Sequence, residues 1–152
     1  MQKLLLIAAS IALYTNPALA DCKVQNAIYT DGARYQLFVD PEQEYHPASF
    51  HIKMLDIKTK EEFLGDIVYN NGYSIPNVTI NLPCPQDEKD SFCGYVGTVY
   101  TITKNSAEYG LNEQKNPILF PDMGFSFYHA WRFSKPYAPI PADVWQFMKC
   151  RQ

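Results

Sequence analysis

Histidine is the side chain that most often acts as a general acid or base near neutral pH, and the chain has three, His46, His51 and His129. A hydrolase would also need a nucleophile, yet no Gly-x-Ser-x-Gly stretch holds a serine at a strand-to-helix turn. His129 stands between Tyr128 and Trp131 in a predicted strand, where a hydrogen-bonded structural histidine is the simpler expectation. A small secreted hydrolase or metal-dependent enzyme that uses one of these histidines is therefore an alternative hypothesis, and no catalytic residue is predicted.

The same histidines offer little for a metal site. Zinc takes nitrogen and oxygen ligands, which could come from His46, His51 and the acidic residues near them, Glu42, Glu44 and Asp56. The two histidines are five residues apart, which is not the spacing of a helical pair, and a proline lies between them. The acidic stretch at 87–90 lacks the alternating oxygen ligands and the central glycine of a calcium loop. We expect neither a metal nor another cofactor.

Four cysteines, Cys22, Cys84, Cys93 and Cys150, form the second reactive group. An even number in an exported chain indicates two disulfides, for which three pairings are possible. The short separation favours Cys84 with Cys93, and Cys22 with Cys150 would bracket the mature chain. The eight residues between Cys84 and Cys93 do not fit a C-x-x-C redox pair, so we expect structural bonds.

The loop between the two central cysteines, "CPQDEKDSFC", is acidic through Asp87, Glu88 and Asp90. A disulfide-closed loop loses little conformational entropy on binding, and its carboxylates would favour a basic partner. The sequence therefore offers this loop as a recognition site, with a solvated tight turn as the simpler alternative.

Aromatic residues are numerous, with 11 tyrosines, nine phenylalanines and two tryptophans. Cross-strand pairs and core packing account for most of them in a β-rich chain. Tyr73, Tyr109 and Tyr137 differ because each adjoins Gly, Asn or Pro in a predicted turn or loop. Exposed rings at these three positions would suit the binding of a protein, peptide or sugar partner.

The first 20 residues have the pattern of a secretory signal peptide, with a lysine, an apolar run at 4–14 and a small-x-small ending at Ala20. We expect cleavage there, leaving residues 21–152 as one exported domain that is periplasmic or secreted. The apolar run is too short to span a bilayer. With 13 basic and 16 acidic residues and no basic cluster, the chain is not expected to bind nucleic acid.

Hairpins are predicted where Asp31-Gly32 and Asn71-Gly72 separate β-favouring runs. A strand over 50–57 changes its apolar phase, which predicts a bulge near Met54. The second hairpin's later arm should be an edge strand or begin only after Pro76, because proline lacks a backbone donor.

The C-terminal half predicts a strand over 94–102, a long loop over 103–117 and further strand character over 118–133. Apolar residues at i, i+3, i+4 spacing then predict a short helical turn over 142–149. The predicted fold is mainly β, an antiparallel sandwich or small barrel of seven or eight strands with that turn and two disulfides, and α+β is the alternative.

These features favour a non-enzymatic binding or inhibitor-type protein, which would recognise a protein or other macromolecule through its tyrosine-bearing loops and its acidic disulfide loop. A structural subunit of an envelope assembly is a further alternative. The oligomeric state stays open.

Overall fold

A computed structural model describes residues 22–41, 49–69, 75–84, 92–111, 115–132, 135 and 137–151. After the 3-10 turn η1 (Val24–Asn26), the strands are β1 (Ala27–Thr30), β2 (Tyr35–Pro41), β3 (Phe50–Asp56), β4 (Glu62–Tyr69), β5 (Pro76–Asn81), β6 (Gly94–Gly97), β7 (Tyr100–Ile102), β8 (Ala107–Tyr109), β9 (Ile118–Leu119) and β10 (Val144–Cys150). One helix, α1 (Met123–Trp131), lies between β9 and β10 in the chain.

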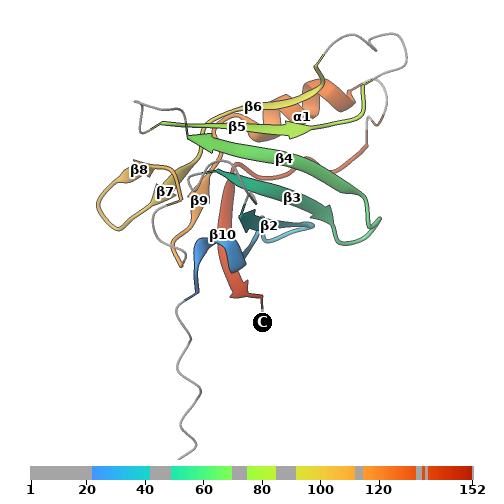
Figure 1. Ribbon diagram of the computed structural model, residues 1–152. Coiled ribbons are helices and arrows are strands. Elements are labelled where there is room, and N and C mark those ends of the chain that lie inside the picture. Colours follow the sequence, from blue (N-terminus) through green and yellow to red (C-terminus); the bar gives the residue numbers. More distant parts are fainter. Residues whose placement is uncertain are drawn as a thin grey trace, which may run out of the picture.

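The described strands form one antiparallel sheet in the order β6-β5-β4-β3-β2-β1-β10-β9-β7-β8, and the sheet curls into a half-barrel (Figure 1). The predicted mainly β class is confirmed. The predicted count of seven or eight strands is wrong, because the described residues already form ten. The additional strands are short: β8 lies inside the predicted loop over 103–117, and the predicted strand over 94–102 is two strands.

The short break between β6 and β7 connects two distant parts of the sheet. β6 pairs with β5 at one end of the sheet, whereas β7 pairs with β8 and β9 at the other. Only Thr98 and Val99 separate the two strands. The hydroxyl of Tyr95 donates to the carbonyl oxygen of Thr98 at 3.1 Å, and a Cβ at Gly97 would lie 2.2 Å from that hydroxyl oxygen. Glycine therefore leaves the space that Tyr95 needs to brace the bend.

The first predicted hairpin is present as β1 and β2. In its turn, Oδ1 of Asp31 accepts backbone N–H groups from the next residues, Ala33, Arg34 and Tyr35, at 2.8 to 2.9 Å. Gly32 has φ +80°, which favours glycine. The local Asp-Gly signal thus predicted the turn correctly.

The arms of the second hairpin are β4 and β5, and its turn lies outside the described residues. β5 begins at Pro76 itself and not, as predicted, after that proline. β5 pairs with β6 as well as with β4, so the edge-strand prediction is wrong.

The bulge predicted near Met54 is also wrong, because β3 keeps an unbroken register with both neighbours. Ile52, Met54 and Asp56 all occupy inward positions. The apolar pattern changes only because the last inward residue is a carboxylate, which Arg34 neutralises. An ion pair, and not an extra residue, explains the change of phase.

Two C-terminal elements were predicted with the wrong type. The strand over 118–133 is present only as β9, and the following residues form α1. The helical turn over 142–149 is instead β10, which pairs with β1 and β9. The predicted strand and helix have thus exchanged places.

The core lies between the curled sheet and α1. Phe63 of β4 places its ring centroid 6.1 Å from that of Phe127 and 5.6 Å from that of Trp131 on α1. The largest fully buried side chains are Trp145, Tyr29, Tyr35, Tyr95, Phe120, Phe127, Leu37, Met54, Ile67, Ile80, Ile118 and Met123. Side chains of this size fill the described interior as they do in small barrels, which makes it a packed core.

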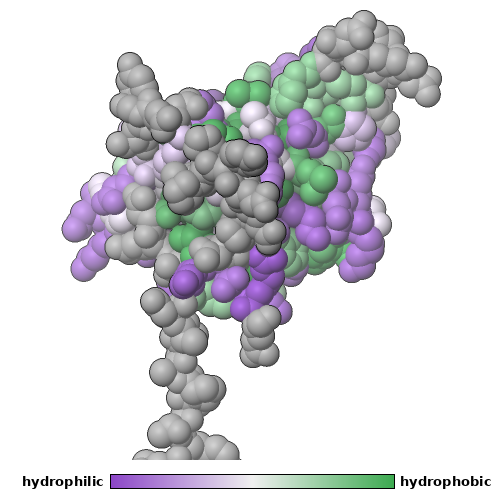
Figure 2. All heavy atoms as spheres, viewed as in Figure 1, coloured by the Kyte–Doolittle hydropathy of each residue, from purple (hydrophilic) through white to green (hydrophobic). Residues whose placement is uncertain are grey.

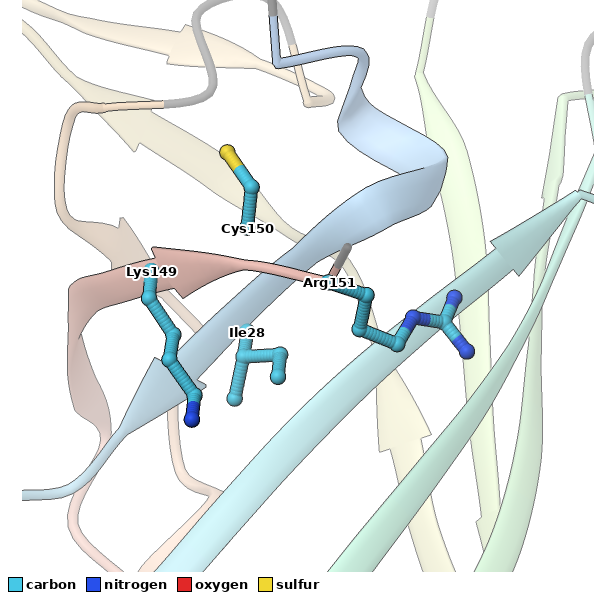
Figure 3. Close-up of a pocket in the computed structure, with 4 residues that line it drawn as sticks. All are labelled: Ile28, Lys149, Cys150 and Arg151. Carbon is cyan, nitrogen blue, oxygen red and sulfur yellow. The ribbon is translucent and has the colours of Figure 1, made fainter. Parts of the chain in front are cut away.

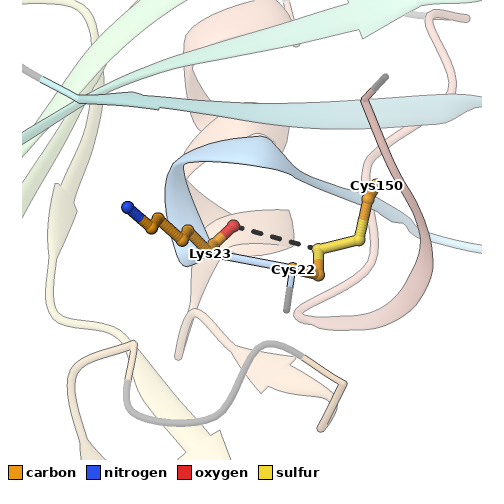
Figure 4. The surroundings of a disulfide bond; sticks show 3 residues. All are labelled: Cys22, Lys23 and Cys150. Atoms are coloured by element: carbon orange, nitrogen blue, oxygen red, sulfur yellow. Dashed lines mark hydrogen bonds between the residues drawn. A yellow bond between two sulfur atoms is a disulfide. The ribbon is translucent and has the colours of Figure 1, made fainter. Parts of the chain in front are cut away.

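Both favoured disulfides are confirmed. Cys22–Cys150 joins the segment before η1 to the end of β10 (Figure 4). Cys84–Cys93 joins the segment after β5 to the start of β6. Among the described residues, no helix has the length and apolarity needed to cross a membrane.

Candidate functional site

Several predicted site residues lie outside the described part of the chain, namely His46, Tyr73, Asp87, Glu88 and Asp90. The acidic loop is located only by its closing cysteines, Cys84 and Cys93. The other candidates can be placed.

The most exposed aromatic group on any one element lies on α1, where Phe125 is 65% exposed and Tyr128 is 54% exposed. The ring of His129 lies beside both, with centroids 4.2 Å from Phe125 and 5.6 Å from Tyr128. Residues three and four apart share one face of a helix. These three side chains therefore form one continuous surface, which we call the α1 aromatic surface.

The opposite face of α1 explains why this surface points to solvent. Met123, Phe127 and Trp131 follow each other at intervals of four residues and are buried against the sheet. The first turn is held by Asp143, the residue before β10, because the N–H of Gly124 donates to its Oδ1 at 2.8 Å. That contact satisfies one of the N-terminal donors that a helix cannot pair internally. Burial on one side and anchoring at the start fix the aromatic face outward.

The segment after α1 adds two exposed side chains. A Cβ at Gly124 would lie 3.3 Å from Cγ2 of Ile140, so this partly exposed isoleucine sits beside the first turn of the helix. Tyr137 is 97% exposed. The predicted exposure of Tyr137 is thus confirmed.

Apolar surface continues beyond the helix. Figure 2 shows green residues gathered over the region where β6 and α1 lie, and α1 packs against β6. Val96 on β6 and Phe92, just before Cys93, are both exposed large apolar residues. The acidic loop therefore leads directly into β6, the strand on which α1 packs.

Tyr109 lies elsewhere, on β8 near the far end of the sheet (Figure 1). It is exposed, as predicted, and its ring centroid lies 4.7 Å from that of Tyr100. A side-chain hydrogen bond shared with Tyr109 raises the pKa of Tyr100. The structure does not bring Tyr109 together with Tyr137 or α1.

His51 forms a cross-strand pair with a carboxylate on the outer face of the sheet. Its Nδ1 lies 2.5 Å from Oδ1 of Asp66, and both side chains are exposed. The register places Asp40 on the other side of His51 and Thr79 beyond Asp66. These four cross-strand neighbours supply a base, His51, and an orienting carboxylate. Their hydroxyl group, on Thr79, neighbours Asp66 and not the imidazole.

His129 is exposed on α1, so the prediction of a structural histidine on a strand is wrong. It lies on a different element from His51. Within the described ranges, no group of three or more His, Cys, Asp or Glu side chains could hold a metal ion.

The fold and surface define a mainly β protein with two disulfides, in whose described part a single helix carries aromatic side chains on its outer face. Comparisons with known proteins add nothing to this description: no protein-family model matches the chain, and neither a curated protein nor a solved structure is significantly similar to it.

Proposed function

We propose that the chain is an exported, non-enzymatic binding protein of the inhibitor type, which recognises a protein partner through the α1 aromatic surface and the acidic disulfide loop. The observation that carries the proposal is the joint exposure of Phe125, Tyr128 and His129 on one helix face. Clustered exposed aromatic side chains are typical of the central residues of protein interfaces.

Charge and rigidity support the same assignment. The acidic loop closes at Cys93, directly before the strand on which α1 packs. A basic partner on the α1 aromatic surface would then be attracted by Asp87, Glu88 and Asp90, which mainly raises the rate of association. Exposed Tyr137 extends the contact area in the segment after α1.

The hydrolase alternative has one observation in its favour, the His51–Asp66 contact. Two exposed side chains on the outer face of a sheet lack the enclosed position that strengthens acid–base catalysis. The envelope-subunit alternative predicts stable self-association, which analytical ultracentrifugation of the mature chain would detect.

The test is affinity capture from the native extracellular or periplasmic fraction with the immobilised mature chain. The double variant Phe125→Ser/Tyr128→Ser should weaken binding of the captured partner about thirtyfold, the factor for losing about 2 kcal/mol at an interface hot spot. Leu64→Ser is the matched control, because Leu64 is 60% exposed but lies on β4. Unchanged affinity in the α1 variant, with circular dichroism confirming its fold, would exclude this surface.

Charge reversal at Asp87, Glu88 and Asp90 tests the loop separately. We expect slower association at low salt and little change at high salt, because salt screens exposed charges. An unchanged association rate at low salt would remove the loop from the proposal.

A further inference from the structure

β10 contains a β-bulge that decides which of its last residues face outward. Lys149 pairs with Ile28 of β1, and Phe147 pairs with the next residue, Tyr29, so Met148 is the extra residue. Met148 and Lys149 are consecutive and both exposed. Side chains alternate between the two faces of a strand, so an unbulged strand would have directed Lys149 into the core.

The bulge has two consequences for the end of the strand. Cys150 turns inward, where it reaches the buried Cys22. Lys149 and Arg151 turn outward on the same side, with Ile28 between them, as Figure 3 shows. Bulges commonly re-aim side chains next to functional sites.

These outward residues line a surface pocket of about 460 Å³, together with Cys150. Ile28 faces outward, because its neighbours Ala27 and Tyr29 belong to the core cluster and Ile28 does not. It is only 4% exposed, and as a lining residue it gives the pocket a small apolar surface.

The walls of the pocket are cationic. Arg151 is held in place, because its Nη2 donates to the carbonyl oxygen of Val39 at 2.6 Å and forms an ion pair with Asp40. Lys149 stands on the other side of Ile28 and is exposed. Among the described residues at the pocket, Lys149 and Arg151 are cationic and Asp40 is anionic.

We propose that this pocket binds a small carboxylate with an apolar tail. Lys149 would accept the carboxylate as a charge-assisted hydrogen-bond donor, and the fixed guanidinium of Arg151 would add attraction. The tail lies on Ile28, and a pocket of this volume suits a ligand of a few carbon atoms. Such a carboxylate is either a free aliphatic acid or the C-terminus of a peptide.

The experiment titrates the mature chain with octanoate, followed by calorimetry and by amide chemical shifts around Ile28. We expect saturable binding of octanoate, much weaker binding of acetate, which lacks the tail, and none of octanol, which lacks the charge. Equal effects of octanol and octanoate, or no saturable binding, would overturn the proposal.

Lys149→Gln should weaken octanoate binding about tenfold, as expected for the loss of one charge-assisted contact. Lys58→Gln, in the exposed turn after β3, is the matched control and should leave it unchanged. Equal affinity of Lys149→Gln and the wild-type chain would refute the assigned contact. A short apolar peptide with a free or an amidated C-terminus separates the sources: preference for the free peptide over octanoate identifies a chain terminus, and the reverse identifies a free acid.

Discussion

The Asp56→Asn substitution should unfold the protein more easily than any exposed charge change on the same sheet. Asp56 is 3% exposed. Nε of Arg34 donates to both of its oxygens at 2.8 Å, and the N–H groups of Lys58 and Thr59 donate to Oδ1 at 2.9 and 3.2 Å. Asparagine keeps the shape but puts an NH₂ group against the guanidinium donors.

The magnitude follows from these contacts. Removing one partner of a buried ion pair costs about 3 to 5 kcal/mol, because the remaining charge and donors lose their acceptor. The pair reaches solvent on its arginine side, so we expect the lower end, about 3 kcal/mol at neutral pH for loss of the Asp56 carboxylate.

Acid should abolish part of this contribution. The hydrogen bond from Arg34 holds the pKa of Asp56 well below its usual value, and the backbone N–H groups of Lys58 and Thr59 act in the same direction. The unfolded chain therefore binds the proton first as the pH falls. The stabilisation is complete above the unfolded pKa of about 3.9 and is lost as the pH falls below it towards the lower folded value.

Urea unfolding at several pH values with intact disulfides measures both effects. The Asp56→Asn variant should have a lower midpoint at pH 7 and a flatter acid dependence below about pH 4. Asp66→Asn is the control, because its ion pair with His51 is exposed and should contribute less than about 1 kcal/mol. Equal midpoints for the two variants, or an unchanged acid dependence, would refute the reasoning.

Three further perturbations test the fold. Replacing both cysteines of the Cys22–Cys150 bond by serine should lower the free energy of unfolding by about 5 kcal/mol, against about 2.7 kcal/mol for the other disulfide, by the chain-entropy relation; equal losses in denaturant would contradict it. Gly97→Ala should cost about 1 to 3 kcal/mol, because its Cβ would displace the Tyr95 hydroxyl, and thermal unfolding with an unchanged midpoint would refute that clash. Burial raises the pKa of Tyr29 to about 12. The stability that the protonated Tyr29 contributes is therefore complete below about pH 10 and is lost as the pH rises towards 12. Tyrosinate absorbance should show the ionisation of Tyr29 only when the protein unfolds.

The parts of the fold that were predictable depend on short-range signals. Asp31-Gly32 specifies its turn through side-chain acceptance and a positive φ, and both are properties of neighbouring residues. The disulfide pairing followed from chain separation alone. Such features need no knowledge of the rest of the molecule.

The exchanged helix and strand show what local pattern cannot decide. Residues 123–131 alternate aromatic with smaller residues, as a strand would, but Met123, Phe127 and Trp131 also repeat every four residues, and packing on the sheet selects that period. In β10 the bulge at Met148 shifts the alternation. Val144 and Met148 are exposed apolar residues, and together with Phe147 they match the i, i+3, i+4 spacing of a helix face. In both segments a tertiary contact outweighed the period of the sequence.

The candidate surfaces were predictable to different degrees. The exposure of Tyr137 could be predicted, because the proline before it signals a loop. Tyr109 is also exposed, but it lies on β8 and not in the predicted turn or loop. The α1 aromatic surface was missed because Phe125 and His129 were assigned to a strand. The four-residue repeat on the opposite face was the signal that could have revealed it.

β10 connects the two surfaces on which these proposals rest. Directly before β10, Asp143 accepts the N–H of Gly124 through its side chain and the N–H of Phe120 through its backbone carbonyl oxygen, both at 2.8 Å, which holds the beginning of α1. At its end, the bulge directs Lys149 outward while the disulfide of Cys150 fixes the strand. Because β10 pairs with β9 at its start and with β1 over the rest of its length, neither surface has to be ordered when a ligand arrives, which lowers the entropic cost of binding. Loss of the Cys22–Cys150 bond should therefore weaken octanoate binding more than partner binding. The pocket adjoins this bond, whereas α1 is held at the other end of the strand.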